Sequence, residues 1–419
     1  MSAKPSNLQI DSGRLWGAIH ETAQFGATAK GGVRRLTLGA EDKQVRDWFR
    51  NACDAAGLEV HVDALGSMFG LRRGRDMSKP PLGIGSHLDT QPTGGKYDGI
   101  LGTLAALEVV RTLNDAGIET ETPLCIINWT NEEGSRFAPA MMASATYAGD
   151  YTTDDIWSRK DAAGITVKEA LDGIGYRGPQ RCGEHPLSAF FEVHIEQGPK
   201  LEAANKDIGV VTGVQAIRWY EATFIGQDSH AGTTPMQRRH DALLGASKLV
   251  QAVNAAAHRH PGAVGTVGLL EVKPGSPNVI PGEVFLTIDL RDPRESVLDR
   301  MAEEIAAEAE AIGAAHGLTV AVKNILAQPA VHFDPQCIAS VRAAAATAGY
   351  STMDLMAGAG HDSVYVSRVA PTTMIFVPCK DGISHNEAEY SSKEQCAAGA
   401  QVLLQAVLDY DRKLAEKLG

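Results

Sequence analysis

Short apolar runs alternate along the chain with segments in which apolar residues recur at helical spacing. Residues 81–87 and 124–129 are apolar runs of the length typical of buried strands. Between them, apolar side chains recur every three or four positions, which predicts a helix and therefore a β-α-β unit. Strand-like and helix-like segments continue to alternate as far as about residue 212, as in α/β proteins.

Beyond residue 213 the order of elements changes. The pattern predicts strands at 219–225, 266–272, 284–291 and 318–322, with helices at 241–257 and 296–315. This β-α-β-β-α-β order is ferredoxin-like. The α/β pattern resumes near residue 330, with a helix at 338–348, a strand at 373–377 and a last helix at 392–414. We therefore expect a smaller domain, 213–329, inserted between two parts of a larger one, 1–212 and 330–419.

Length and composition agree with two soluble domains. A chain of 419 residues exceeds the size that one core usually serves. No apolar run approaches the roughly 20 residues of a membrane span, and the first residues lack the features of a signal peptide, so we expect a cytoplasmic protein without a membrane partner. The formal charge of −12 disfavours nucleic acid as a partner. The six cysteines show no metal-knuckle or CxxC spacing.

The first candidate for chemistry is the segment GSHLDTQPTGGKYDGILG. His87 ends a predicted strand, Asp89 follows two residues later, and Asp98 precedes a helix in a glycine-rich turn. His87 is a ligand type that zinc favours, Asp89 could orient its ring, and the two oxygens of Asp98 could bridge two cations. The alternative for each is structural, because turns favour Asp and a strand can end in a hydrogen-bonded His.

Two adjacent acids follow the second buried run, in NWTNEEGSRF. Glu132 and Glu133 repel each other there unless cations or protons relieve them. One acid binding metal while the other moves a proton would satisfy both. The alternative is a solvated loop, where charged residues are mostly found.

Two more segments carry histidines. In FFEVHIEQGPKLEA, strand alternation places Glu192, His194 and Glu196 on one face, which could also be a solvent-exposed face. His385 lies in the polar segment KDGISHNEAEYSS before the last helix and would be unremarkable alone.

Taken together, these motifs are recognisable. The chain resembles the M20 metallohydrolases, and within them the hydantoinase/carbamoylase amidase branch, through HLDT, KYDGILG, NEEGSRF, HIEQG, DSHAGTTPM, PNVIPGE, GAGHDS and GISHNE. The resemblance implies an α/β fold: a catalytic domain of the aminopeptidase-like three-layer α/β/α type, with an inserted ferredoxin-like α+β lid and dimerisation domain.

The resemblance also implies two divalent metal ions. One would be held by His87, Asp98 and His194, and the other by Asp98, Glu133 and His385. Mixed imidazole and carboxylate ligands favour zinc, while manganese, cobalt and nickel suit them too.

Catalytic roles follow from the same resemblance. A water between two cations loses a proton easily, and Glu132 would act as general base and acid. Asp89 would orient His87. His230 would stabilise the developing oxyanion and would come from the partner subunit of a homodimer; without the resemblance it would be an ordinary loop histidine.

Substrate contacts are expected on both domains. Arg291 lies on the same strand face as Thr287 and Asp289 and could grip a substrate carboxylate, or could pair with Asp289 or Asp292 instead. By resemblance, the remaining substrate contacts would be Gln197, Asn278 and Gly360. His361 is equally consistent with supporting a ligand and with a purely structural role.

The implied reaction is hydrolysis of the carbamoyl C–N bond of N-carbamoyl amino acids, either N-carbamoyl-β-alanine or N-carbamoyl-L-α-amino acids, to amino acid, ammonia and carbon dioxide. The alternative enzyme is an allantoate or ureidoglycolate type of amidohydrolase. A peptidase is disfavoured because His194 stands where aminopeptidase-like relatives have a carboxylate. A non-catalytic small-molecule binding protein on the same fold would not need the complete set of ligands with Glu132.

Overall fold

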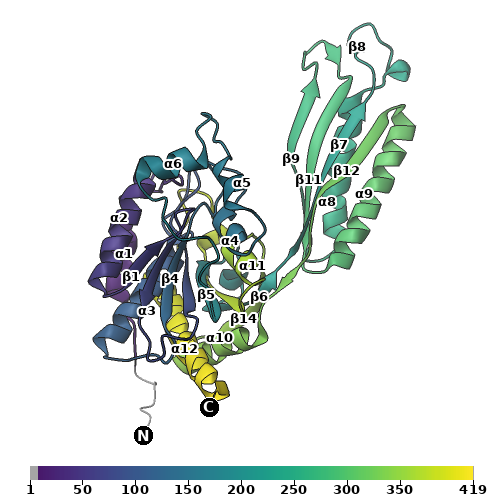
Figure 1. Ribbon diagram of the computed structural model, residues 1–419. Helices are drawn as coiled ribbons and strands as arrows, with labels where there is room; N and C mark the ends of the chain where they lie inside the picture. Colours follow the sequence, from purple (N-terminus) through teal and green to yellow (C-terminus); the bar gives the residue numbers. More distant parts are fainter. Residues whose placement is uncertain (1–7, 419) are drawn as a thin grey trace. The chain divides into compact units, whose positions relative to one another are not determined.

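The protein consists of two compact units in this computed structural model, which describes residues 8–418 (Figure 1). The first unit contains the chain up to Gly213 and again from His332, and the second is Val214–Val331. The second unit is therefore inserted into the first. The sequence pattern placed the two crossings at 212/213 and 329/330.

The first unit is built on a mixed sheet of nine strands. Its central strands β4, β3, β5 and β15 are neighbours and run parallel, so their carboxyl ends meet at one edge. In sheet order the strands are β1 (Glu59–Val62), β2 (Met68–Arg72), β4 (Leu124–Trp129), β3 (Leu82–His87), β5 (Ala189–Ile195), β15 (Thr372–Val377), β6 (Ile208–Val214) and β13 (Val331–His332), with β14 (Thr352–Ala357) paired to β6.

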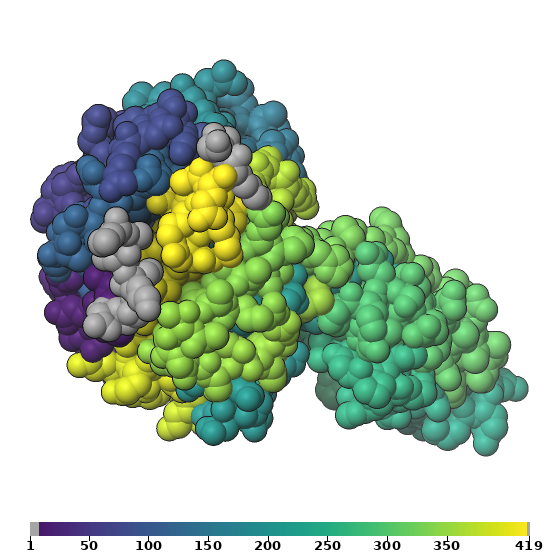
Figure 2. Space-filling model, turned by 90° about the horizontal axis from the view of Figure 1, so that it is seen from below, coloured from purple at the N-terminus to yellow at the C-terminus, as the bar shows by residue number. Residues whose placement is uncertain are grey.

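Helices cover both faces of this sheet. Neighbouring residues of one strand join different apolar clusters: Ile126 and Phe191 belong to one, and Ile127 and Phe190 to the other. One face carries α1 (Ser12–Thr22), α2 (Ala40–Ala55), α3 (Ile100–Asp115), α10 (Pro335–Ala348) and α12 (Lys393–Leu418), of which α10 and α12 pack side by side (Figure 2). The other carries α4 (Met142–Tyr147), α5 (Thr153–Trp157), α6 (Val167–Ile174) and α11 (Asp362–Val366). The expected three layers are confirmed.

Three further helices are short and lie outside the layers described above. They are α7 (Lys200–Ala203) and η2 (Lys380–Gly382) in the first unit and η1 (Met236–Arg238) in the second.

The second unit has the expected β-α-β-β-α-β order. Its elements are β7 (Ala216–Ile225), α8 (Ala242–Arg259), β9 (Val264–Lys273), β11 (Glu283–Asp292), α9 (Glu295–His316) and β12 (Thr319–Gln328). The sheet order is β12-β7-β11-β9, with all pairs antiparallel. Alternate residues of β11 (Val284, Leu286, Ile288, Leu290) are buried against α8 and α9, and the face bearing Arg291 is not covered by these helices.

Several elements differ from the sequence expectation. The last strand of the second unit extends to Gln328 instead of ending at 322, because a register irregularity near Asn324 breaks the alternation that marks a strand. A small ladder of β8 (Ser229–His230) and β10 (Val279–Ile280) was not predicted. Within residues 8–418, no helix has both the length and the apolarity needed to cross a bilayer.

Candidate metal centre

The candidate ligands meet at the edge where the parallel strands end. His87 is the last residue of β3, Glu132 and Glu133 follow β4, and His194 is the last but one residue of β5. Asp98 lies in the turn before α3, which packs on β3. The carboxyl edge of parallel strands is where α/β folds place their ligands. The polar side chains at these strand ends and turns therefore gather at the carboxyl edge of the sheet.

The first ligand group is His87, Asp98 and His194. All three side chains are buried, with His87 only 1% exposed. Asp98 Oδ1 lies 3.6 Å from His87 Nε2 and 3.1 Å from His194 Nε2. His87 Nε2 has no hydrogen-bond partner among residues 8–418, and an unsatisfied buried polar atom is costly. A cation at this position would satisfy it.

The second ligand group uses the other oxygen of Asp98. Asp98 Oδ2 and Glu133 Oε2 each lie 3.4 Å from His385 Nε2. Asp98 thus faces both groups, as a bridging carboxylate must. His385 differs from the other ligands because its side chain is 50% exposed, and its φ of +54° is in the left-handed region. The donor sets fit two divalent cations, since imidazole nitrogens and carboxylate oxygens are ordinary ligands of such ions.

Backbone groups orient both buried imidazoles. His87 Nδ1 lies 3.0 Å from the carbonyl oxygen of Asp89, and His194 Nδ1 lies 2.9 Å from that of Ile195. Donation from Nδ1 leaves the Nε2 lone pair for a cation. The Asp89 carboxylate is 3.7 Å from His87 Nδ1 and instead accepts the backbone N–H groups of Glu132 and Glu133, at 3.3 Å each. Asp89 therefore orients His87 through its carbonyl and fixes the Glu132 loop through its carboxylate.

Crowded charges shift the acids and bases of the cluster. Burial raises the pKa of Glu132 well above its usual range, and burial together with nearby Asp98 raises that of Glu133 to about 7. Burial opposes ionisation of Asp98, but the nearby rings of His194, His385 and His87 hold its pKa well below its usual range. The hydrogen bond to Asp98 raises the pKa of His385 to about 9. A site with this excess of buried acid is one that cations stabilise.

Residues 83–409 match the family described as Peptidase family M20/M25/M40. The chain belongs to this family. It is 47% identical to an N-carbamoyl-L-amino-acid amidohydrolase of Rhizobium meliloti over 98% of this chain and 99% of that protein. It is 32% identical to the allantoate amidohydrolase of Bacillus subtilis, over 92% and 94%. A crystal structure of a hydantoinase/carbamoylase family amidase from Burkholderia multivorans is similar with a TM-score of 0.91 at 52% identity, covering 96% and 98%. The resemblance to the amidase branch of M20 proteins is confirmed.

Glu132, expected as general base in this M20 protein, lies directly beside the first ligand group. Its Oε2 is 3.6 Å from His87 Nε2, and its side chain is almost fully buried. Glu192, which could have faced solvent, is also buried, and it accepts hydrogen bonds from Ser86 and Ser363. The polar face of β5 is thus an interior face.

Gln197 and His361 also lie in the cluster, and Gly360 beside it in sequence. Gln197 Nε2 donates to Asp98 Oδ2 at 2.9 Å, while its buried Oε1 has no acceptor role among the described residues. The ring of His361 packs edge to face on His194 at a centroid distance of 4.5 Å, so it supports the ring of this candidate ligand. A Cβ on Gly360 would meet only the flexible end of Met141. Close packing within the described chain therefore does not require this glycine.

The remaining candidates lie on the second unit and do not gather at one point. His230 lies in the β8–β10 ladder and Asn278 directly before β10; both are exposed, and Ala231 N–H donates to the Asn278 carbonyl. Arg291 lies at the opposite end of β11 and forms a two-point ion pair with Asp289, Nε to Oδ1 at 3.0 Å and Nη2 to Oδ2 at 2.8 Å. The ion pair considered as an alternative is present.

Glu389 is a site residue that the sequence did not reveal. Its buried carboxylate accepts the backbone N–H groups of Tyr97 and Asp98 at 3.1 and 3.0 Å, and the Ser384 hydroxyl at 2.9 Å. It therefore joins the turn of Asp98 to the loop of His385. The only sequence signal was a further acid four residues after His385, which a solvated loop explains equally well.

Proposed function

We propose that the protein hydrolyses the carbamoyl C–N bond of N-carbamoyl amino acids, releasing amino acid, ammonia and carbon dioxide. The observation that carries this proposal is the bridging position of Asp98 between two ligand groups, with Glu132 beside them. His87, Asp98, His194, Glu133 and His385 would hold two divalent cations, with zinc favoured. When bound, such ions acidify water and polarise a carbonyl group. The N-carbamoyl-L-amino-acid amidohydrolase among the relatives supports the choice of substrate.

Glu132 would move the proton. Its carboxylate is kept in a site that burial makes unfavourable for charge, which favours accepting a proton. In the proposal, Glu132 takes a proton from the attacking water and then gives it to the amino acid nitrogen as its bond to the carbamoyl carbon breaks; the carbamate released decomposes to ammonia and carbon dioxide. The bonds from the Glu132 and Glu133 N–H groups to Asp89 keep this loop in place.

Arg291 would hold the substrate carboxylate. Its guanidinium makes two parallel bonds with Asp289, and the same two donors could serve a substrate carboxylate in this proposal. The Arg291 and Asp289 side chains are partly exposed, so a second carboxylate could compete. His230, Asn278, Gln197 and Gly360 remain the further substrate contacts of this proposal.

The positions of His230 and Arg291 favour a homodimer. Arg291 pairs with Ile217 of β7, while the ladder of His230 follows the other end of that strand, Ile225. Eight residue steps along a strand span about 26 Å. This is far longer than any N-carbamoyl derivative of one amino acid, so the two residues of one chain cannot serve the same substrate molecule.

The second unit also has a surface on which such a dimer could form. β9 is an edge strand of its sheet, and its Val264, Leu269 and Leu270 side chains are exposed. An unpaired edge with apolar side chains is a natural place for a second copy.

Mixed dimers test this arrangement. Coexpressed Glu132→Gln and His230→Ala chains, and in parallel Glu132→Gln and Arg291→Ala chains, would be assayed for activity that neither variant shows alone. If His230 and Arg291 reach a substrate from different copies, only one of the two mixtures recovers activity. Recovery in both mixtures or in neither contradicts the arrangement.

Ammonia release tests the reaction itself. Metal-reconstituted protein would be assayed with N-carbamoyl-β-alanine, several N-carbamoyl-L-α-amino acids and allantoate. Glu132→Gln should lower kcat by about 10²- to 10⁴-fold without loss of metal, while Glu108→Gln, a buried glutamate paired with Arg14, should not. Turnover of allantoate alone would favour the second candidate, a ureide hydrolase. The allantoate amidohydrolase among the relatives is the reason to test this candidate. No ammonia from any substrate would leave the binding-protein alternative.

A further inference from the structure

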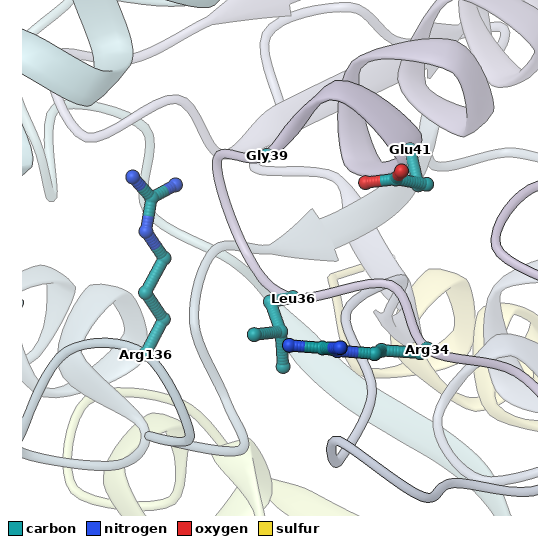
Figure 3. Close-up of a pocket in the computed structure, with 5 residues that line it drawn as sticks. All are labelled: Arg34, Leu36, Gly39, Glu41 and Arg136. Atoms are coloured by element: carbon teal, nitrogen blue, oxygen red, sulfur yellow. The ribbon is translucent and has the colours of Figure 1, made fainter.

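A cavity of about 380 Å³ lies in the first unit, and its lining contains none of the proposed metal ligands. It is lined by Arg34, Leu36, Gly39, Glu41 and Arg136. Arg34, Leu36 and Gly39 come from the segment that leads into α2, Glu41 from the first turn of that helix, and Arg136 from the loop after β4 (Figure 3). The volume falls within the roughly 300–1,000 Å³ typical of small-molecule sites.

Two guanidinium groups of the cavity retain unused donors. Arg34 is exposed, and its guanidinium forms no hydrogen bond or ion pair within the described chain. Arg136 uses Nε for Asp161 and Nη1 for the carbonyl oxygens of Thr37 and Leu38. Its Nη2 has no acceptor among residues 8–418. The contacts of Arg136 hold it rigidly at the cavity wall while one edge of its fork remains available.

Glu41 adds the opposite charge and Leu36 an apolar surface. The Glu41 carboxylate forms no ion pair with any described residue, including the two arginines. Figure 3 shows Arg34 and Arg136 on opposite sides of Leu36, with Glu41 across Gly39 from Arg136. The lining therefore presents two positive groups and one negative group that do not neutralise each other by direct contact.

We propose that this cavity binds a free amino acid as its zwitterion. The carboxylate would lie on the available edge of the Arg136 guanidinium, with the Arg34 guanidinium adding positive charge from the other side of Leu36, the ammonium on Glu41, and the side chain against Leu36. A simple carboxylic acid would meet the repulsion of Glu41, and a simple amine that of two arginines. A free amino acid is also the product of the proposed reaction, and this one step rests on the proposed function. The cavity would then be a second site for product, beside the loop that carries Glu132 and Glu133.

Three matched ligands test the charge pattern. L-Alanine, propionate without the ammonium, and ethylamine without the carboxylate would be titrated calorimetrically into the metal-reconstituted full chain. The same titrations in Arg291→Ala remove the proposed carboxylate anchor of the reaction, so that binding in the cavity is measured without it. Alanine should bind in both proteins, about tenfold more tightly than either fragment, since each fragment loses a charge-assisted contact.

Two cavity variants sharpen the test. Arg34→Ala should weaken alanine binding about tenfold. Glu41→Gln should weaken alanine binding but strengthen propionate binding, because it removes an attraction for one ligand and a repulsion for the other. The proposal is overturned if alanine does not bind, if Arg34→Ala leaves its affinity unchanged, or if propionate equals alanine in the unaltered protein. Alanine binding without ammonia release would contradict the proposed reaction but not this site. Ammonia release without alanine binding in the cavity would contradict this site but not the proposed reaction.

Discussion

The metal-ligand cluster of the first unit and the candidate substrate residues of the second unit are built in opposite ways. His87 and His194 are buried, and backbone carbonyl groups fix their rings. His230 and Asn278 are exposed, and Arg291 lies near the end of β11 in the other sheet of the second unit, the four-stranded one. The first arrangement is complete within one unit. The candidate residues of the second unit do not form one cluster by themselves.

The difference matches the two roles proposed for these residues: metal ligands need fixed positions, whereas substrate contacts need to be accessible. Ligands that share one carboxylate tolerate little movement, so they lie at strand ends inside the core. Residues that receive a substrate must remain accessible until it arrives. His385, a candidate ligand of the second group, is intermediate, because its side chain is half-exposed.

Removing the shared ligand should have the largest effect. Asp98→Asn removes the charge that both groups use, and we expect loss of both cations and of activity, whereas His385→Ala should lose one cation. Metal affinity should fall by more than the about 100-fold that follows loss of a hydrogen-bond partner of a ligand. Metal content per chain after gel filtration measures the effect, with Asp172→Asn, a surface residue paired with Arg177, as control. Asp98→Asn protein that still holds two cations would show that the groups are independent.

Changing the recognition side should leave the metals untouched. Arg291→Lys replaces a two-point fork by a single point charge, so kcat/KM for an N-carbamoyl amino acid should fall about 10- to 100-fold at unchanged metal content. Arg294→Lys is a matched control, because Arg294 makes the same kind of pair with Asp292 two residues away. Equal losses in both variants would assign the effect to the stability of the strand end instead.

The sequence predicts the buried side of this comparison better than the exposed side. The apolar runs ending at His87 and Trp129 coincide with β3 and β4, and polar residues at the ends of such runs stand out. His194 stands out similarly within β5. Because parallel strands share an edge, their ends come together once the fold is known. The ferredoxin-like order of the second unit followed from alternation and helical spacing.

Other features needed the folded chain. Whether Glu192 faced solvent or the interior could not be read from alternation, because period two gives opposite faces without saying which is covered. The carbonyl of Asp89 rather than its carboxylate receives the His87 ring, a choice that depends on a few tenths of an ångström. The ion pair of Arg291 is present, while its role as substrate anchor stays a prediction, since both interpretations require the same side chain on the same strand face. Exposed residues carry no hydrophobic pattern that could place them.

Glu389 offers the finest test of how the buried cluster is held. Its carboxylate accepts two N–H groups at the Asp98 turn and the hydroxyl of Ser384, next to His385. Glu389→Gln places an amide among these donors, and we expect affinity for the second cation to fall about tenfold, while the first, held by ligands with their own carbonyl contacts, changes less. Stepwise metal titration separates the two cations. Glu387→Gln is the matched control, because Glu387 lies in the same loop but accepts from Thr28. If both variants lower the affinity for both cations alike, the loop acts only as a scaffold. If Glu389→Gln alone lowers the affinity for the second cation, the half-exposed His385 depends on this buried carboxylate for its position, whereas the buried histidines are positioned by their own strands.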